Sequence, residues 1–311
     1  MGPLVLLTGA SSFSGMWIAE ALAGAGFEVL APLLRERGAY DAERRSRIAR
    51  VEQVAEVVYG HPFGSRAFLD LVRSRPDVAA LAHHAADITG YRDPDFDAQA
   101  AFARNLAGAP EVLRTLAGQG CQVALVTGTV FEAGEGGSFN ELLAVTPYGL
   151  SKTLTNIALQ HYAAWAGLTF GRVVIPSPYG AYEQQRSFPA YLFRSWFAGE
   201  TPVVRTPLYL RDHLPAPVLA RAYAGHMAAL LADPATPAIS RPSGWIATQG
   251  DFAEKVALEA GRRLGHDCPV SLAEQTELPE PLRRVNGEPA TPQDWDEAAF
   301  WDEYVGWYAR R

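Results

Sequence analysis

The amino-acid sequence predicts an α/β fold, a doubly wound parallel sheet with a smaller, partly interleaved C-terminal lobe. Apolar runs of strand length alternate with amphipathic helical segments from Leu4 to about Ile175. The first of these runs leads through a turn of small residues into a helix. The 311 residues, 48% of them hydrophobic, are enough to bury a large core, as one interleaved unit or as two lobes.

The first strand is predicted to begin at Leu4, and the turn after it has the sequence T-G-A-S-S-F-S-G. An amphipathic helix is expected over residues 16–23. A strand, a glycine-containing turn and a helix are typical of a dinucleotide site, where pyrophosphate rests on the helix N-terminus. Gly9 and Gly15 bracket the turn, but Ser12 or Phe13 stands where the backbone must approach a phosphate closely. An ordinary turn between a strand and a helix remains the alternative.

The end of the second strand, within the segment 27–37, bears on the choice of cofactor. An NAD enzyme carries an acidic residue here that holds the ribose hydroxyls. In this chain Leu33 or Leu34 occupies the position, and Arg35 and Arg37 follow. An arginine accommodates a 2′-phosphate, so the sequence favours NADP over NAD. The alternative is that both arginines only solvate a loop.

Two further strands are predicted over residues 78–84 and 122–127. The first ends in His83 and His84, and the second ends in the hydroxyl residue Thr127. Adjacent strand residues face opposite ways, and no acidic or cysteine residue lies at a useful spacing from the histidines. We therefore expect the histidines to pack near a cofactor and expect no metal site.

A helix is predicted to begin after Thr146, its N-cap, with Pro147 in the first turn. Tyr148 and Lys152 are four residues apart and share a face of this helix. A nearby cation favours the phenolate, so we expect Lys152 to lower the pKa of Tyr148 and let the hydroxyl exchange a proton with a reacting oxygen. The spacing alone is a weak signal, because it also occurs by chance in many helices.

The later elements complete the predicted domain organisation. A strand is expected over 168–175, a break in regular structure over 176–180, and helices over 188–198, 218–232, 251–264 and 294–308. Irregular strand and loop are expected over 199–210, and a loop over 277–293. We expect residues 1–175, with 211–235 returning to them, to form a dinucleotide-binding domain. Residues 176–210 and 236–311 are expected to form a substrate-binding lobe.

These motifs, taken in order, resemble the extended branch of the short-chain dehydrogenase/reductase superfamily. This branch is the NAD-dependent epimerase/dehydratase family, which acts on nucleotide-linked sugars and has a Rossmann-like sheet. The T-G-A-x-G-F-I-G turn of the family resembles residues 8–15, and its H-x-A-A strand end resembles residues 83–86. Its N-x-x-G-T helix resembles residues 105–109, its S-S-x-x-V-Y-G segment the run that begins at Val126, and its R-D-x-x-x-V-x-D segment residues 211–218. The chain departs from these patterns at the middle glycine, the helix threonine and the second acidic residue.

The resemblance implies a catalytic role for four residues. Tyr148 would be the acid/base, and Lys152 would supply the cation and hold the nicotinamide ribose. Thr127 would align the substrate oxygen with Tyr148, and Asn105 would hold a water of the proton relay. Each residue also has a purely structural interpretation, as a strand-end, core or surface side chain.

The resemblance also implies two binding sets. The cofactor set is Gly9, Ser11, Ser12, Phe13, Gly15, Arg35, Arg37, His84, Ala85, Ala86 and Lys152. The substrate set is Thr129, Tyr148 and Arg211, where Arg211 would hold the substrate diphosphate through its planar guanidinium. Arg283 or Arg284 would add a second phosphate contact.

Three functions are weighed. Sugar-nucleotide 4,6-dehydratases of the family carry an Asp-Glu pair after the catalytic threonine, whereas this chain has Gly128-Thr129, so dehydratase chemistry is not expected. We expect a ketoreductase that transfers hydride from NADPH to a 4-keto sugar nucleotide. The alternative is an epimerase with tightly bound NAD. A catalytically silent dinucleotide-binding protein is the third reading, against which the four intact catalytic positions argue.

Composition excludes other classes of function. The net charge is −7 and no basic stripe is present, so we expect no nucleic-acid partner. Cys121 and Cys268 are too few for a disulfide framework and favour a reducing compartment. No segment reaches the roughly 18 to 20 apolar residues of a membrane span. Because a strand begins at Leu4, no signal peptide is expected either, and the expected location is the cytoplasm. The expected partner is a small-molecule nucleotide sugar, and a homodimer is left open.

Overall fold

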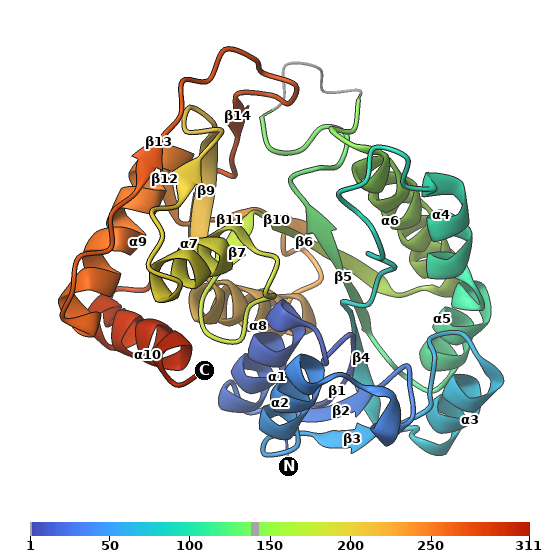
Figure 1. Cartoon of the computed structure of the whole chain (residues 1–311). Helices are drawn as coiled ribbons and strands as arrows, with labels where there is room; N and C mark the ends of the chain where they lie inside the picture. Colours follow the sequence, from blue (N-terminus) through green and yellow to red (C-terminus); the bar gives the residue numbers. More distant parts are fainter. Residues whose placement is uncertain (1, 138–142) are drawn as a thin grey trace.

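The fold is a seven-stranded parallel sheet with helices on both faces, beside which smaller sheets and helices from the later part of the chain are packed (Figure 1). The computed structural model describes residues 2–137 and 143–311. The order of strands in the large sheet is β10-β6-β5-β4-β1-β2-β3. The predicted α/β class and the doubly wound parallel sheet are confirmed.

The large sheet and its helices are formed mainly by the first two thirds of the chain. The strands are β1 (Leu4–Thr8), β2 (Glu28–Pro32), β3 (Glu56–Val58), β4 (Val78–His83), β5 (Val123–Thr129), β6 (Thr169–Ile175) and β10 (Ile239–Ser240). The helices are α1 (Phe13–Gly24), α2 (Ala42–Val51), α3 (Arg66–Ser74), α4 (Ala98–Leu106), α5 (Ala109–Gly118), α6 (Pro147–Ala166) and α8 (Ala216–Ala232), and a short 3₁₀ turn spans Arg37–Ala39.

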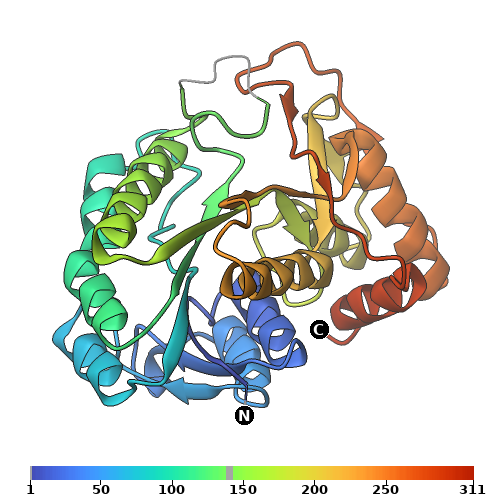
Figure 2. The ribbon, with the colours of Figure 1, turned by 180° about the vertical axis from the view of Figure 1, so that it is seen from behind.

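Alternation along β1 divides the core into two layers. Val5 and Leu7 face the layer that contains α1, α2 and α8, whereas Leu4 and Leu6 face the layer that contains α3, α5 and α6. All four side chains are buried. Because both faces of the sheet are covered, its strands read as continuous apolar runs and not as alternating ones. Figure 2, seen from behind, shows the same sheet between its two helical layers.

The order of the strands reverses at β1. The chain passes from β1 to β2 and β3 on one side and then crosses to β4, β5 and β6 on the other. β1 and β4 are neighbours and run parallel, with Thr8 opposite His83 at their carboxyl ends. In a doubly wound sheet, ligands bind in the crevice outside such a reversal.

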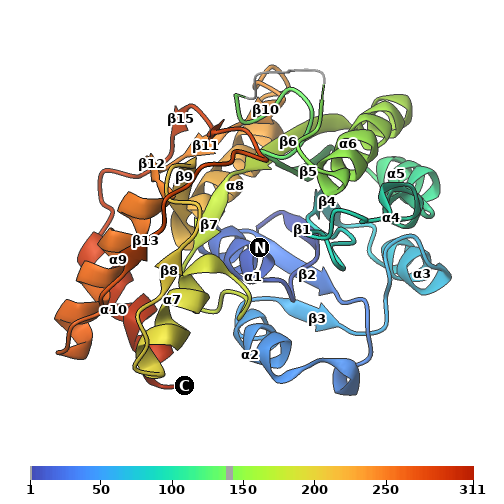
Figure 3. The same cartoon turned by 45° about the horizontal axis from the view of Figure 1, so that its top comes forward.

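The second lobe is built from short strands and three helices (Figure 3). One sheet has the order β12-β9-β14, with β7 also paired to β9, and two-stranded sheets are formed by β11-β15 and β13-β8. The strands are β7 (Ser177–Tyr179), β8 (Val203–Val204), β9 (Leu210–Pro215), β11 (Pro242–Ser243), β12 (Trp245–Thr248), β13 (Ser271–Leu272), β14 (Arg283–Arg284) and β15 (Glu288–Pro289). The helices are α7 (Phe188–Phe197), α9 (Gln249–Leu264) and α10 (Glu297–Ala309).

Two predicted irregular segments are corrected by the structure. Residues 176–180 were expected to break regular structure, but β7 lies within them and pairs with β9. Pro178 is tolerated because β7 is an edge strand, which needs hydrogen bonds on one side only. The predicted loop over 277–293 contains β14 and β15, two strands of two residues each. Their pairing partners, β9 and β11, are distant in sequence, so no local pattern indicated them.

Two strands lie across the predicted domain boundaries. β9 begins at the start of the segment 211–235 but belongs to the smaller four-stranded sheet, whereas β10 comes from 236–311 and is an edge strand of the large sheet. The chain therefore interleaves at both places. The division into a dinucleotide-binding domain and a substrate-binding lobe stays a prediction. Within the described ranges, no helix is both long and apolar enough to cross a membrane.

Candidate active site

One large cavity, of about 1570 Å³, lies at the carboxyl ends of the sheet and extends to the second lobe. Most of the residues predicted for a site line it, namely Gly9, Ser11, Ser12, Phe13, Arg35, His84, Ala85, Ala86, Asn105, Thr127, Thr129, Tyr148, Lys152, Arg211 and Arg284. Gly15 packs under the turn, and Arg37 and Arg283 do not line the cavity. The fold thus brings together residues that are up to about 275 positions apart in the chain, from Gly9 to Arg284.

The turn after β1 is closely packed. Gly9 has a φ of +78°, and a Cβ at this position would lie 2.8 Å from the backbone nitrogen of Ala85. A Cβ on Gly15 would lie 2.2 Å from the carbonyl oxygen of Gly9. Ser12, at the position where the family has its middle glycine, is the N-cap of α1, and its hydroxyl accepts a hydrogen bond of 3.0 Å from the Gly15 backbone. The turn keeps two necessary glycines and uses the third position to cap the helix.

After the end of β2, only one of the two arginines predicted to determine the cofactor preference lines the cavity. Leu33 is buried and Arg35 lines the cavity. Arg37 instead forms an ion pair of 2.5 Å with Glu52 outside the cavity. Arg44 of α2 also lines the cavity. Sequence reasoning missed Arg44, because it lies on a helix whose position over the cavity depends on tertiary packing.

His84 joins the turn to the end of β5. Its Nδ1 lies 2.9 Å from the hydroxyl oxygen of Thr127, and its Nε2 lies 2.9 Å from that of Ser14 and 3.1 Å from that of Ser12. Burial, followed by the charge of Lys152, lowers the pKa of His84 to about 3. The imidazole is therefore neutral at neutral pH and acts there as a hydrogen-bonding group.

His83 has different neighbours, as expected for the adjacent residue of a strand. Its Nδ1 lies 3.0 Å from the hydroxyl oxygen of Thr8, and its ring packs on Phe63 with 4.1 Å between the ring centroids. Burial, then the charges of Lys152 and His84, lowers its pKa to about 3 as well. Among the residues that the structure describes, no group of three metal-ligating side chains occurs.

The helix that carries Tyr148 and Lys152 begins as predicted. The Thr146 hydroxyl accepts a hydrogen bond of 3.1 Å from the backbone of Gly149, and Pro147 opens α6. The Tyr148 ring lies edge-on to Tyr91, with 5.3 Å between the ring centroids. It also lies edge-on to two phenylalanines, Phe96 and Phe131. Lys152 is 5% exposed. Both side chains line the cavity, so the predicted pair does face one space.

The expected effect of Lys152 on Tyr148 is not what the structure shows. Burial raises the pKa of Tyr148 above its ordinary value, and the charges of Glu132 and Tyr91 raise it further. Burial also lowers the pKa of Lys152. The pKa of Tyr148 is raised because its ring, although it lines the cavity, is surrounded by protein. Removing a phenolate from water costs free energy.

Thr127 and Asn105 lie on neighbouring elements of the site. Thr127 is 6% exposed and follows four apolar residues of β5. Asn105 lies in the last turn of α4, and its Oδ1 accepts a hydrogen bond of 2.8 Å from the backbone of Asp87. The Asn105 Nδ2 is buried and has no hydrogen-bond partner within residues 2–137 and 143–311. A buried amide donor of this kind is costly unless a water or ligand accepts from it.

Two buried arginines form the far end of the cavity. Arg211 and Arg284 are each 6% exposed, and β14 pairs with β9 so that the two residues are direct neighbours. Glu280 contacts both, at 3.1 Å from Arg211 Nη2 and 3.2 Å from Arg284 Nη1. Burial, followed by the charge of Arg211, lowers the pKa of Arg284 to about 10. Of the two candidates for a second phosphate contact, the geometry favours Arg284, since Arg283 is exposed.

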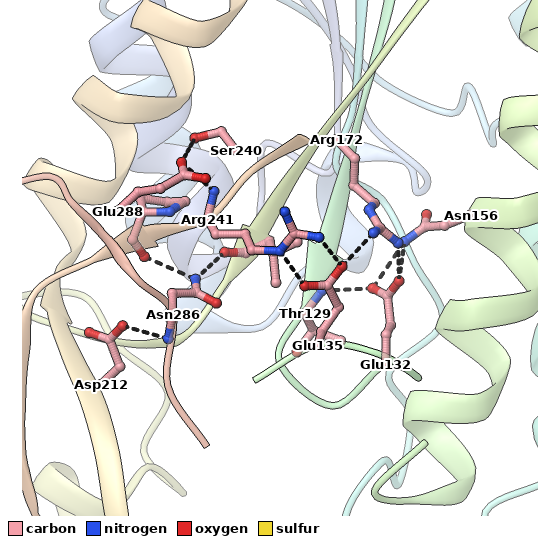
Figure 4. A network of polar contacts seen from close by, with 12 residues as sticks. Thr129, Glu132, Glu135, Asn156, Arg172, Asp212, Ser240, Arg241, Asn286 and Glu288 are labelled. Carbon is pink, nitrogen blue, oxygen red and sulfur yellow. Dashed lines mark hydrogen bonds and ion pairs between the residues drawn. The ribbon is translucent and has the colours of Figure 1, made fainter. Parts of the chain in front are cut away.

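Sequence reasoning missed a network of charges built on two buried carboxylates next to this site (Figure 4). It contains Glu132 and Glu135, which follow β5, together with Arg172 of β6 and Arg241 from the segment after β10. The available signal was Arg172 itself, a charged residue inside an otherwise apolar strand. Its partners could not be identified, because the segment after β5 contains no recognisable element.

The order of the strands and the tight turn at the reversal of the sheet define a doubly wound fold of the dinucleotide-binding class. The sequence profile described as NAD dependent epimerase/dehydratase family matches residues 5–230. The chain belongs to this family, as its motifs predicted. A comparison with curated protein sequences finds no match.

Solved structures of similar fold include three that bind nucleotides. A UDP-N-acetylglucosamine 4-epimerase from Methanobrevibacter ruminantium, in complex with UDP-N-acetylmuramic acid, is 14% identical, with a TM-score of 0.75 and 99% of each chain covered. A UDP-glucuronic acid 4-epimerase from Bacillus cereus, in complex with UDP-glucuronic acid and NAD, is 15% identical, with a TM-score of 0.72 and the same coverage. A dTDP-glucose 4,6-dehydratase from Streptomyces venezuelae, with NAD bound, is 18% identical, with a TM-score of 0.74 and 99% and 97% covered. These similarities establish the fold.

Proposed function

We propose that this chain binds a nicotinamide dinucleotide and a nucleotide-linked sugar in one cavity, and that it transfers hydride to or from a sugar carbon and a proton to or from the oxygen on that carbon. The observation that carries the proposal is the continuity of the cavity. The glycine turn lies at one end, the buried arginine pair lies at the other, and Thr127, Tyr148 and Lys152 lie on its wall between β5 and α6. Its volume exceeds the roughly 300–1,000 Å³ of a pocket for one small ligand.

The residues present fit a dinucleotide. At Gly9 a side chain would collide with the backbone of Ala85, so this position requires glycine. The turn leads into α1, and a helix N-terminus suits a phosphate. The Nδ2 of Asn105, which has no hydrogen-bond partner among the described residues, supplies a buried donor in the same cavity. The turn over residues 9–15 would hold the pyrophosphate, and Lys152 the nicotinamide ribose. When bound, the nicotinamide supplies the hydride acceptor or donor.

The proton steps are assigned to residues of this chain. Tyr148 is a neutral phenol at neutral pH, as an ordinary tyrosine is, and its raised pKa keeps it in this form. From this form it would donate a proton to a developing alkoxide. In the opposite direction it must accept a proton as a phenolate, which the Lys152 ammonium would stabilise. Thr127, held by His84 at 2.9 Å, would hydrogen-bond the substrate oxygen and keep it near Tyr148. Asn105 would hold a water that returns the proton to Tyr148.

Epimerisation of the sugar is the reaction that the comparisons support best. Two of the three similar structures described above are 4-epimerases, and one of these contains NAD. An epimerase removes hydride and returns it to the opposite face of the same carbon, so the cofactor stays bound. Elimination of water is disfavoured, because Gly128 and Thr129 stand where the family's dehydratases carry acidic residues.

Ketoreduction with NADPH is the second candidate, and one observation favours it. Leu33 is buried where an NAD enzyme carries an acid, and Arg35 lines the cavity two residues later. A guanidinium there is suited to the 2′-phosphate that distinguishes NADP from NAD. An exchangeable NADP would suit a reductase, which must release oxidised cofactor in every cycle.

One experiment separates the candidates. The purified protein is denatured, and the released dinucleotide is identified and quantified. The native protein is then incubated with UDP-glucose, UDP-glucuronic acid and UDP-N-acetylglucosamine without added cofactor, and separately with a 4-keto nucleotide sugar and NADPH. Co-purified NAD and interconversion of sugars without net redox change support the epimerase. Stoichiometric oxidation of NADPH supports the reductase. Binding of dinucleotide without turnover of any substrate would leave a catalytically silent protein and contradict the proposal.

A further inference from the structure

A cluster of charges around two buried carboxylates lies at the carboxyl end of β5, and the reaction proposed above does not use it (Figure 4). Its carboxylates belong to Glu132 and Glu135, which are 0% and 2% exposed. Arg172 contacts both, with Nη1 3.0 Å from Glu132 Oε2 and Nη2 2.5 Å from Glu135 Oε1. Arg241 donates to Glu135 at 2.7 Å and 3.0 Å. The two glutamates therefore share one arginine but have different further partners.

Glu132 also connects the two elements that carry the catalytic candidates. Its Oε1 accepts a hydrogen bond of 2.7 Å from the backbone of Thr129, the last residue of β5. Both of its oxygens accept from Asn156 of α6, at 3.0 Å and 2.9 Å. Thr127 lies two residues before the first contact, and Lys152 lies one helical turn before the second. The carboxylate thus links the Thr127 strand to the Lys152 helix.

Glu132 is the anionic group that acts on Lys152. Burial is the main cause that lowers the pKa of Lys152, and the charge of Glu132 opposes it, whereas the charge of Arg172 adds to it. The other titratable groups coupled to Lys152 are His83 and His84, which are neutral at neutral pH. A buried carboxylate is poorly screened by water, so its effect on a nearby ammonium is strong.

We propose that Glu132 is a positioning residue for Tyr148 and Lys152. It connects the end of β5 to α6 by hydrogen bonds, and its buried negative charge stabilises the Lys152 ammonium. This inference rests on the proposed function, because it assigns no contact with substrate or cofactor to Glu132 itself. The S-S-x-x-V-Y-G pattern that resembles this segment has glycine at the corresponding position. The carboxylate is therefore a feature of this chain and not of the family pattern.

The test compares Glu132→Gln with Glu135→Gln. Glu135 is the matched control, since it is equally buried and bound to Arg172 but has no hydrogen bond to Thr129 or Asn156 among the described residues. The affinity for NADH is measured by fluorescence between about pH 6 and pH 10, below the ordinary lysine pKa of roughly 10.4, because the pKa of Lys152 is lowered. Without Glu132 the ammonium loses its proton at lower pH. We expect the pH midpoint at which NADH affinity is lost to fall by about one unit in Glu132→Gln, and to stay unchanged in Glu135→Gln.

Lys152→Ala distinguishes failure of this inference from failure of the proposed function. If Lys152→Ala binds NADH as tightly as the unmodified protein at every pH, Lys152 does not hold the cofactor, and both proposals fail. If Lys152→Ala weakens NADH binding but the midpoint does not move in Glu132→Gln, or moves equally in both glutamine variants, only the role of Glu132 is overturned.

Glu132→Gln removes a buried charge, so a second variant covers the case in which it does not fold. Asn156→Ala keeps every charge of the network and removes the hydrogen bonds that α6 donates to Glu132. We expect it to bind NADH about threefold or more weakly, an effect on the order of one neutral hydrogen bond, with an unchanged pH midpoint. Circular dichroism and thermal melting establish that the variant is folded. Wild-type affinity in a folded Asn156→Ala would contradict the positioning role.

Discussion

At the scale of single residues, the site depends on burial more than on proximity. Tyr148 and Lys152 lie on one face of α6, as their spacing indicates, yet the pKa of Tyr148 is raised and that of Lys152 is lowered. Each shift is caused first by removal of the charged form from water. The ligand-free site therefore holds a phenol, and the phenolate must be stabilised after cofactor and substrate bind.

Replacement of Tyr148 by phenylalanine tests the acid/base. The phenylalanine ring preserves the packing against Tyr91 and the two phenylalanines, so we expect Tyr148→Phe to fold normally. It should lose at least about two orders of magnitude in turnover, the usual contribution of a positioned acid or base. Tyr91→Phe is the control, since Tyr91 packs on the same ring without a proposed role in proton transfer. Turnover of the nucleotide sugar is measured for both, and an active, folded Tyr148→Phe would remove Tyr148 from the mechanism.

The choice between NADP and NAD is tested at Arg35. We expect Arg35→Ala to weaken NADPH binding by on the order of 1 to 3 kcal/mol, the range for one charge-assisted contact. NADH binding should change little, because NADH lacks the 2′-phosphate. Arg37→Ala is the matched control, since Arg37 is paired with Glu52 outside the cavity. Fluorescence titration of both reduced cofactors checks this. Unchanged affinity for NADPH would mean that Arg35 only solvates the loop, and an equal loss for NADPH and NADH would mean that Arg35 does not distinguish the 2′-phosphate.

At the scale of elements, the segment before β14 covers the arginine pair. Glu280 lies between the guanidinium groups of Arg211 and Arg284, where the substrate diphosphate is proposed to bind. A carboxylate and a phosphate compete for the same planar donors. The carboxylate of this segment therefore offsets part of the positive charge of the pair while no substrate is present, at the expense of affinity for the substrate.

Removal of this carboxylate should strengthen nucleotide binding. We expect Glu280→Gln to bind UDP about three- to tenfold more tightly, since one competing charge-assisted hydrogen bond is lost. Glu277→Gln, in the same segment and exposed, should bind UDP like the unmodified protein. Isothermal titration calorimetry with UDP measures both. Weaker binding in Glu280→Gln would show that Glu280 instead orders the arginines for the substrate.

At the scale of the whole molecule, one buried carboxyl group joins the connection between β7 and α7 to the last helix. Glu183 is 1% exposed and accepts hydrogen bonds from Tyr304 and Tyr308 of α10. Burial raises its pKa to about 7, although these hydrogen bonds act in the opposite direction. Since the unfolded chain has an ordinary carboxyl pKa of roughly 4.3, the folded protein binds this proton more tightly than the unfolded chain does.

This group makes stability dependent on pH. Its contribution is fully present below the unfolded pKa and is lost as pH rises through about 7, so the free energy of unfolding should fall by about 4 kcal/mol across that window. Glu183→Gln, which cannot ionise, should lack this decrease. Denaturant unfolding of both proteins at several pH values isolates the group as their difference. A difference that does not change with pH would contradict the raised pKa.

The sequence by itself was sufficient for the fold class and for the elements that depend on local patterns. The apolar run before Gly9, the cap at Thr146 and the helix over 251–264 were each predictable, because periodicity, capping and turn chemistry involve residues close in the chain. The structure has α9 at Gln249–Leu264 and α6 opening at Pro147, within two residues of these predictions. The family followed from the order of such local motifs and is confirmed by the profile match.

The tertiary structure alone decided what depends on distant residues. It placed Arg35 in the cavity and Arg37 outside it, paired Arg284 with Arg211, and surrounded Tyr148 with protein that raises its pKa. It also assembled the buried network around Glu132 from segments that carry no local signal. Burial and electrostatic coupling are set by which side chains meet in space and how much water is excluded between them, and no spacing along the chain encodes either.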